Sequence, residues 1–159
     1  MVFGTRRQFL IVLGALALTA CARGGTEPAE IVPSTTPLHP NETPELRRLI
    51  EAAARENDVP VDLVHRVIIR ESRHRPGARN GPYYGMMQIL PATASSMGFR
   101  GQPTDLLDAE TNLRYAVRYL RGAWLLSDGS HDRAVMWYAR GYYYEAKRRG
   151  MLRETGLRS

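Results

Sequence analysis

Apolar side chains recur at helical spacing through most of the sequence after residue 43, and no run shows the two-residue alternation of a strand. Start signals agree with this pattern, because Thr43 before Pro44 suits a helix cap and first turn, and Asp108 suits a second cap. We therefore expect an all-α fold. The expected helices cover about residues 44–57, 60–71, 91–98, 108–126 and 131–140, with a short helical segment from about Gly85 and a last turn or two up to Arg149.

Two connecting segments are also expected. Residues 73–84 contain two prolines and two glycines, which predicts a loop. Asp128-Gly129 predicts a turn, after which His131 or Asp132 is expected to cap the next helix. A chain of 159 residues allows one folded domain, which we place at residues 44–159.

Glu71 is an acidic residue on the apolar face of a predicted helix. Ile68, Val67 and Val64 lie three, four and seven residues before it, and these spacings share one helical face. A carboxyl group there is costly unless it is paired, bound to a metal or used in chemistry. Desolvation raises its pKa and keeps it protonated, which suits a general acid. The alternative is a structural glutamate held by a helix cap or a neighbouring arginine.

The first twenty residues have the pattern of an export signal. Arg6 and Arg7 precede an apolar run that ends near Ala20 and is too short to span a bilayer as a mature helix. Twin-arginine export and general export both remain open for this arginine pair. We expect residues 1–20 to be a signal peptide that is removed.

Cys21 is the only cysteine in the chain, so no disulfide can form within it. With Leu18-Thr19-Ala20 before it, Cys21 resembles the bacterial lipobox, whose cysteine is lipidated and becomes the first mature residue. The resemblance implies a lipoprotein held at a membrane by acyl chains such as palmitate. Ala22, in place of aspartate, favours the outer membrane of a Gram-negative envelope. The alternative is an ordinary cleavage site with a small apolar residue beside it.

Residues 21–43 are rich in Pro, Gly, Thr and Glu and lack periodicity, which predicts a disordered tether. The net charge of the chain is +6 and falls to +4 once the two signal-peptide arginines are removed. Excess positive charge suits an acidic partner. The carboxylates of peptidoglycan stems fit an exported protein and nucleic acid does not, although such charge can also serve solubility alone.

Four sequence motifs follow one another in a familiar order. They are Glu71-Ser72, then Gly85-Met86-Met87-Gln88-Ile89-Leu90-Pro91 with Thr93-Ala94 and Gly98, then Asn112 with Tyr119-Leu120, and last Tyr138-Ala139-Arg140-Gly141. Residues 44–148 thereby resemble the catalytic domain of the soluble lytic transglycosylases (SLT), of the goose-type-lysozyme-like class. Two places depart from the family pattern. Asn80 to Tyr84 replace its Ser-x-x-Gly-Ala, and Ala139-Arg140 replace its Asn-Ala.

The resemblance implies a lysozyme-like helical domain and a lyase that cleaves peptidoglycan with one glutamate. Glu71 would first protonate the oxygen between N-acetylmuramic acid and N-acetylglucosamine, and its carboxylate would then take the proton of the muramic C6 hydroxyl. The product would be a 1,6-anhydro end. A second carboxylate, which most glycosidases need, is not evident near Glu71. Asp62 lies nine residues back, about two and a half turns away and round the helix. Loop and capping positions explain Asp105, Asp108 and Glu110.

The resemblance also nominates residues that contact the substrate. Tyr138 matches the tyrosine that touches the catalytic glutamate, and Gln88 and Met87 match a pair on the cleft wall. Met87 and Tyr138 have core packing as an alternative. Ser72 has helix capping as an alternative, and Asn80 lies near the position of the family's cleft serine. Four further tyrosines are candidate stacking platforms, some of which must be core: Tyr83, Tyr84, Tyr142 and Tyr143.

No cofactor or metal is expected, because His39, His65, His74 and His131 are scattered without metal-ligand spacing. The leading hypothesis is thus a peptidoglycan lytic transglycosylase on the periplasmic side of the envelope. A muramidase that hydrolyses the same bond and a wall-binding lipoprotein without activity are the alternatives. A basic nucleic-acid binder is disfavoured by the export signal, and the oligomeric state is open.

Overall fold

The fold is known from a computed structural model that describes residues 36–158. The expected signal peptide, Cys21 and most of the expected tether lie outside the described residues. The described part forms one compact unit that begins at Thr36. The unit therefore takes in residues 36–43, just before the first helix, of which Glu42 is buried.

The described part is helical, as expected, with one very small sheet. The helices are α1 (Pro44–Glu56), α2 (Val61–Glu71), α3 (Pro91–Ser96), α4 (Ala109–Leu125), α5 (His131–Arg140) and α6 (Tyr143–Arg148), with a 3₁₀ helix, η1, at Pro103–Leu107. The strands β1 (Arg79–Asn80) and β2 (Tyr83–Tyr84) pair antiparallel. Among residues 36–158, no helix is long and apolar enough to cross a membrane.

The helix starts follow the capping residues of the sequence, with one exception. The Thr43 hydroxyl accepts a hydrogen bond from the Leu46 amide at 3.1 Å, and the Asp108 carboxylate accepts one from the Thr111 amide at 2.8 Å. Helix α5 is capped by Ser130, so the expectation of a cap at His131 or Asp132 is wrong. Serine competes well for this position because its short hydroxyl reaches the free amides of the first turn.

Two other local expectations also need correction. The segment that starts at Gly85 forms turns and not a helix, because Asn112 occupies the hydrogen-bonding groups of its backbone, as described below. The loop at residues 73–84 contains the β1–β2 hairpin, in which Asn80 pairs with Tyr83 and Arg79 with Tyr84. Strands of two residues are too short to produce a visible alternation.

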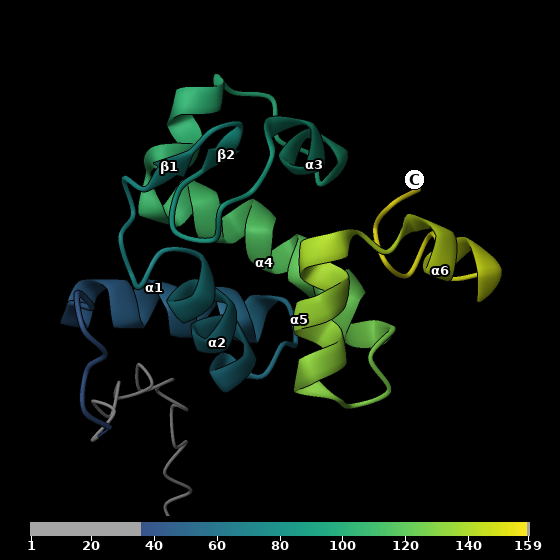
Figure 1. Cartoon of the computed structure of the whole chain (residues 1–159), viewed down its shortest axis with the longest axis horizontal. Coiled ribbons are helices and arrows are strands. Elements are labelled where there is room, and N and C mark those ends of the chain that lie inside the picture. Colours follow the sequence, from purple (N-terminus) through teal and green to yellow (C-terminus); the bar gives the residue numbers. More distant parts are fainter. Residues whose placement is uncertain (1–35, 159) are drawn as a thin grey trace, which may run out of the picture. The chain divides into compact units, whose positions relative to one another are not determined.

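Helix α4 lies at the centre of the fold and packs against α1, α5, η1 and α3 (Figure 1). Helix α2 packs across α1 and beside α5, which brings the end of α2 toward the hairpin side of the fold. The core is built from the apolar faces of these helices together with the turns after β2. Its completely buried members include Ile50, Leu63, Val64, Val67, Ile68, Met86, Met87, Leu120 and Leu126.

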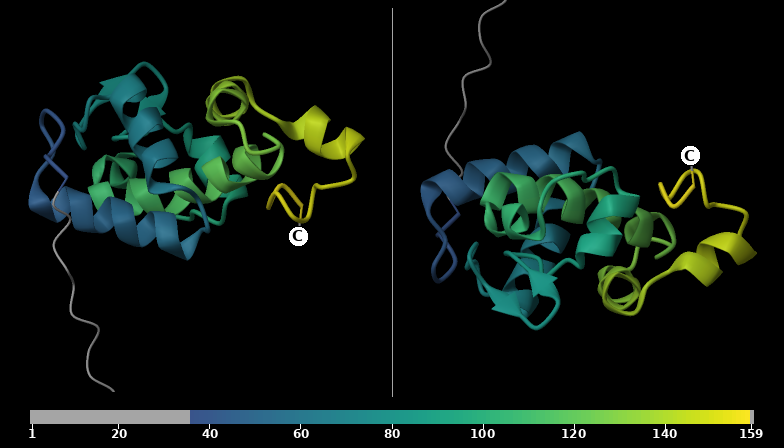
Figure 2. Two further views of the ribbon diagram at one scale, coloured as in Figure 1. Left: turned by 90° about the horizontal axis from the view of Figure 1, so that it is seen from below. Right: turned by 90° about the horizontal axis from the view of Figure 1, so that it is seen from above.

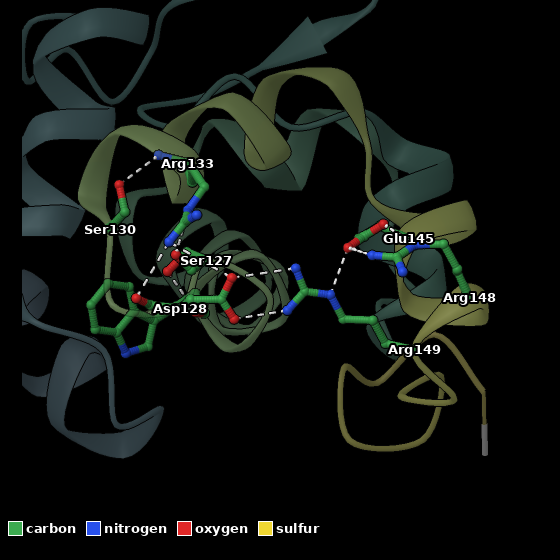
Figure 3. Close-up of polar contacts among 8 residues, drawn as sticks. Ser127, Asp128, Ser130, Arg133, Glu145, Arg148 and Arg149 are labelled. Atoms are coloured by element: carbon green, nitrogen blue, oxygen red, sulfur yellow. Dashed lines mark hydrogen bonds and ion pairs between the residues drawn. The ribbon is translucent and has the colours of Figure 1, made fainter.

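Helix α6 and the residues after it lie at one end of the described part, beyond α5 (Figure 2). Figure 3 shows the charged groups that join this end to the turn before α5. Arg149 bridges Asp128, at 2.8 Å, and Glu145, at 2.5 Å, and Arg133 donates to the Ser127 carbonyl. Asp128 and Arg133 are exposed, so their ion pairs add little stability. Arg149 and Glu145 are partly buried, and together these contacts tie α6 to the turn before α5.

Candidate active site

The turns between β2 and α3 are fixed by a buried asparagine. Asn112, in the first turn of α4, donates to the carbonyls of Tyr84 and Leu106 at 2.9 Å each and accepts from the Met87 amide at 2.9 Å. Gly85 must be glycine here, because its φ is +74° and an added Cβ would overlap the Asn112 side chain. The Gly85 and Asn112 motifs are therefore two halves of one contact.

Met87 and Gln88 follow directly in this turn. Met87 is completely buried, and its carbonyl accepts a hydrogen bond from the Tyr138 hydroxyl at 2.9 Å. Gln88 has a positive φ of 50° and donates from its side chain to the carbonyls of Ala78 and Gly85. The structure thus places the Met87 side chain in the core, and it places the Gln88 side chain at a surface hollow with its amide nitrogen already engaged.

The hollow beside Gln88 has a volume of about 260 Å³. It lies between the β2–α3 turns and the end of α5. Its lining residues are Tyr83, Gln88, Ile89, Leu90, Thr93, Tyr119, Tyr138, Ala139, Arg140 and Gly141. This hollow brings together the second and fourth sequence motifs, and the two altered positions, 139 and 140, lie on its rim.

Glu71 is the last residue of α2 and lines a second hollow of about 540 Å³, with Asn41, Arg70, Ser72, Arg73 and Arg75. Its side chain is 23% exposed, whereas Val64, Val67 and Ile68 on the same helix face are completely buried. Burial raises the pKa of the Glu71 carboxyl, and the positive charge of Arg70, whose Nε lies 3.5 Å away, partly opposes this. Such a carboxyl can hold a proton and still reach solvent.

Tyr138 occupies the inner wall of the Gln88 hollow. Burial raises the pKa of its hydroxyl well above the usual value, and the charge of Glu71 contributes to the shift, which places the two groups within electrostatic range. The hydroxyl therefore stays neutral and directs its proton to the Met87 carbonyl. No hydrogen bond joins Tyr138 to Glu71 in the described residues, so the charge of Glu71 acts on the phenol only through space.

Two aromatic residues behind Tyr138 complete this wall. Tyr119 packs edge-on against Tyr138 and stacks on Tyr142, with ring centroids 5.5 and 4.6 Å apart. Tyr142 is core, since its ring fills the space left by Gly122 and its hydroxyl donates to the Tyr119 carbonyl. Tyr119 was not predicted as a site residue, although Tyr119-Leu120 belongs to one of the recognised motifs.

The remaining candidates fall into buried and exposed groups. Ser72 is buried, and its hydroxyl accepts a hydrogen bond from the Arg75 amide at 3.2 Å, which shapes the chain after α2. Asn80 and Tyr83 are exposed on the hairpin, whereas Tyr84 is buried beneath the Arg79 guanidinium. Tyr143, on α6, is also exposed, so it joins Asn80 and Tyr83 in presenting a side chain to solvent.

Three of the four histidines gather around the start of α1 and the end of α2, so the expectation of scattered histidines is wrong for His39, His65 and His74. Burial lowers the pKa of His65 to about 4 and also lowers the pKa of His74. Beside them Glu42 is buried and paired with Arg47. This cluster is the part of the described chain with ligand atoms close enough to hold a metal ion.

Comparison with known proteins shows which family the helical domain belongs to. The family model for the transglycosylase SLT domain matches residues 48–151, which include all four sequence motifs. The chain belongs to the transglycosylase SLT domain family. The family and the helical, lysozyme-like fold class expected from the sequence are thus confirmed.

One curated relative of this SLT domain is the peptidoglycan transglycosylase gp16 of Escherichia phage T7, which is 37% identical over 98 residues. The alignment covers 58% of this chain and 7% of the phage protein, so the chain spans a small part of that relative's length. No solved structure gives a significant match to the chain.

Proposed function

We propose that this SLT domain is a peptidoglycan lytic transglycosylase in which Glu71 is both the acid and the base. The observation that carries the proposal is the position of Glu71 at the end of α2. Its carboxyl group is partly desolvated, its pKa is raised, and it opens onto a hollow in which it is the one acidic lining residue among those described. The phage relative, named a peptidoglycan transglycosylase, supports the choice of substrate.

The reaction uses one carboxyl group twice, first as an acid and then as a base. Protonated Glu71 gives its proton to the glycosidic oxygen as the bond from that oxygen to C1 of the muramic residue breaks. The ionised carboxylate then removes the proton of the C6 hydroxyl while that oxygen bonds to C1, which closes the 1,6-anhydro ring and restores protonated Glu71. No water is consumed. Proton transfer by a placed side chain contributes about 10²–10⁴-fold in rate.

Arg70 supports the ionised stage of this cycle. Its guanidinium lies 3.5 Å from the Glu71 carboxylate and favours the charged form that exists between the two proton transfers. Burial favours the protonated form that begins the cycle. The opposition of these two influences suits a carboxyl that must act in both directions.

The predicted substrate-contact residues fall into those that can touch sugar and those that are buried beneath the site. Asn80, Tyr83 and Gln88 face solvent or line the hollow and can touch sugar directly. Met87 and Ser72 are buried and would act by shaping the backbone beside the site. Tyr138 would act by holding the Met87 carbonyl, with its neutral phenol within range of the charge on Glu71.

Mass spectrometry of peptidoglycan digested by the chain tests the proposal, beside Glu71→Gln. We expect muropeptides with anhydro ends, lighter than reducing muropeptides by one water, and we expect Glu71→Gln to release none. Reducing ends would instead make the protein a muramidase. Intact wall binding with no products from either form would make it a binding protein.

We also propose that Cys21 carries a lipid anchor and that the domain works from the periplasmic face of the outer membrane. The support is the sequence alone: the apolar run before Cys21, the lone cysteine and Ala22 after it. A multi-chain anchor gives stable membrane attachment. Metabolic labelling with a palmitate analogue, beside Cys21→Ser, is expected to label the parent chain only, and fractionation of the membranes then locates it.

A further inference from the structure

Three segments of the chain bring histidine rings into one cluster away from the proposed chemistry. His39 precedes α1, His65 lies within α2, and His74 follows α2. The ring of His39 stacks on that of His74 with centroids 5.0 Å apart and planes 11° apart, and it lies 4.8 Å from the ring of His65. His65 and His74 are buried, while His39 is half-buried and gives the cluster an opening to solvent.

Ligand atoms of His39, Glu42 and His65 lie within 4.8 Å of one another. The closest approach recorded is 3.9 Å, between His65 Nε2 and Glu42 Oε1. A tetrahedral ion with bonds of about 2.1 Å needs its ligand atoms about 3.4 Å apart. Small side-chain rotations, chiefly of half-buried His39, would bridge that difference, so the three residues lie close to the geometry of a metal site.

The groups around these three residues are those that orient metal ligands. His65 Nδ1 and His74 Nε2 form a hydrogen bond at 3.1 Å. When His65 Nδ1 carries the proton, its Nε2 lone pair faces Glu42, and a ligating histidine usually donates its other ring N–H in this way. His74 Nδ1, on the far side of that ring, is a buried polar atom without a hydrogen-bond partner among the described residues.

Glu42 is held in place by groups that leave one oxygen partly free. Arg47 donates to both carboxylate oxygens, at 2.7 and 2.6 Å, and the His39 amide donates to Oε2 at 2.8 Å. Since each oxygen can accept two hydrogen bonds, Oε1 retains one lone pair, and this is the oxygen nearer to His65. The Glu42 carboxylate also lies between Arg47 and the site, so it separates the guanidinium from a bound cation.

We propose that His39, Glu42 and His65 bind one divalent transition-metal ion, with His74 as a positioning residue. Two imidazole nitrogens and one carboxylate oxygen favour zinc over calcium or magnesium, which prefer oxygen ligands throughout. The fourth position faces the opening beside His39 and is available to water.

The ion would fasten the segment before α1 to the helix that ends at Glu71. Asn41, in that segment, already donates to the Arg73 carbonyl at 3.0 Å and lines the hollow that contains Glu71. A metal bond from His39 to His65 would therefore fix where the preceding chain passes the hollow. The site is structural, and it stands whether or not the proposed reaction is correct.

Zinc titration of the full chain, purified in detergent without a histidine tag, tests the proposal. We expect calorimetry to show one Zn²⁺ per chain, a rise in melting temperature with zinc, and visible absorption of a four-coordinate complex when Co²⁺ replaces it. His39→Phe keeps the ring that stacks on His74 and removes the ligand nitrogen. We expect this variant to bind Zn²⁺ at least ~10-fold more weakly and to lose the thermal response, while circular dichroism confirms that it is folded.

Two control variants address other sources of binding. His131→Phe removes a histidine outside the cluster, where the ring packs edge-on against Trp124, and Cys21→Ser removes the one thiol. Both are expected to bind Zn²⁺ as the parent chain does. Absence of saturable binding, unchanged affinity in His39→Phe, or loss of binding in either control would overturn the proposal.

Discussion

Glu42 and Glu71 are both removed from water, yet burial has opposite outcomes for the pKa values of their carboxyl groups. Glu42 has a completely buried side chain, and burial alone would raise its pKa, yet hydrogen bonds from Arg47 and the His39 amide lower that pKa to about 2. Glu71 is 23% exposed and has only Arg70, at 3.5 Å, to oppose burial, so its pKa is raised. The more deeply buried carboxyl is thus the one that stays ionised.

The difference teaches that hydrogen-bond donors, more than depth, decide what a carboxyl group does. Glu42 receives three donated hydrogen bonds and is tied to Arg47 as part of the structure. Glu71 receives no comparable set from the described residues and keeps a proton to give. Two glutamates thus take different roles: Glu42, which accepts hydrogen bonds from N–H groups, is a fixed structural carboxylate, and Glu71, which lacks such donors, is suited to donate a proton.

Replacement of Glu71 gives the largest expected effect. Glu71→Gln removes the proton donor and should lower the rate of anhydromuropeptide release by about 10²–10⁴-fold. The free energy of unfolding should change by no more than about 0.5 kcal/mol, because the carboxyl has few directed contacts to lose. Glu45→Gln, at an exposed position of α1, is the matched control. A Glu71→Gln chain that keeps a tenth of the parent rate would end the single-glutamate mechanism.

Replacement of Glu42 should lower stability and leave the rate nearly unchanged, the reverse of what is expected for Glu71. Glu42→Gln leaves the buried Arg47 guanidinium without its counter-charge, which should lower the free energy of unfolding by about 3–5 kcal/mol. The rate per folded molecule should remain near that of the parent. Urea unfolding with a chelator present measures the first quantity, and the combination Glu42→Gln with Arg47→Met should recover part of the loss. A stable Glu42→Gln chain would show that the pair contributes nothing to the fold.

The sequence predicted the parts of this comparison that depend on local spacing. The face shared by Glu71 with Val64, Val67 and Ile68 follows from helical periodicity, and the cap at Asp108 follows from residue type. Glu42 and its neighbours were not predicted, because they meet only after residues 39–74 have folded together. Three histidines from three segments show no spacing that a one-dimensional pattern can detect.

Other differences arise from competition between local signals. Gly85 begins a segment with apolar residues at close spacing, which suggested a short helix, but Asn112 takes up the backbone groups that a helix would need. The roles of Met87 and Gln88 depend on the same contact. Recognition of the motifs placed these residues at the site, whereas their burial could be known only from the three-dimensional packing.

Tyr138 tests how the two hollows are coupled. Tyr138→Phe removes the hydrogen bond to the Met87 carbonyl and should lower the free energy of unfolding by about 1 kcal/mol. The rate should fall by about tenfold or less, because the phenol makes no hydrogen bond to Glu71 and acts by holding the Met87 carbonyl beside the site. Tyr144→Phe, at an exposed position, serves as the control. A rate loss as large as that of Glu71→Gln would assign the hydroxyl to the chemistry itself.

The smallest expected effect is a shift of the pH profile on replacement of Arg70, the arginine beside Glu71. The free enzyme needs protonated Glu71, so kcat/KM should fall as the pH rises through a pKa that lies above the ordinary 4.5. Arg70 lowers that pKa, so Arg70→Gln should move the fall to higher pH. The exposed position of the arginine limits this shift to about half a unit. Arg66→Gln, on the same helix with its charge paired to Asp132, should leave the profile in place. A shift in the opposite direction would mean that Arg70 does not act on Glu71 by charge. Glu71 would then owe its state to burial alone, and its contrast with Glu42 would be complete.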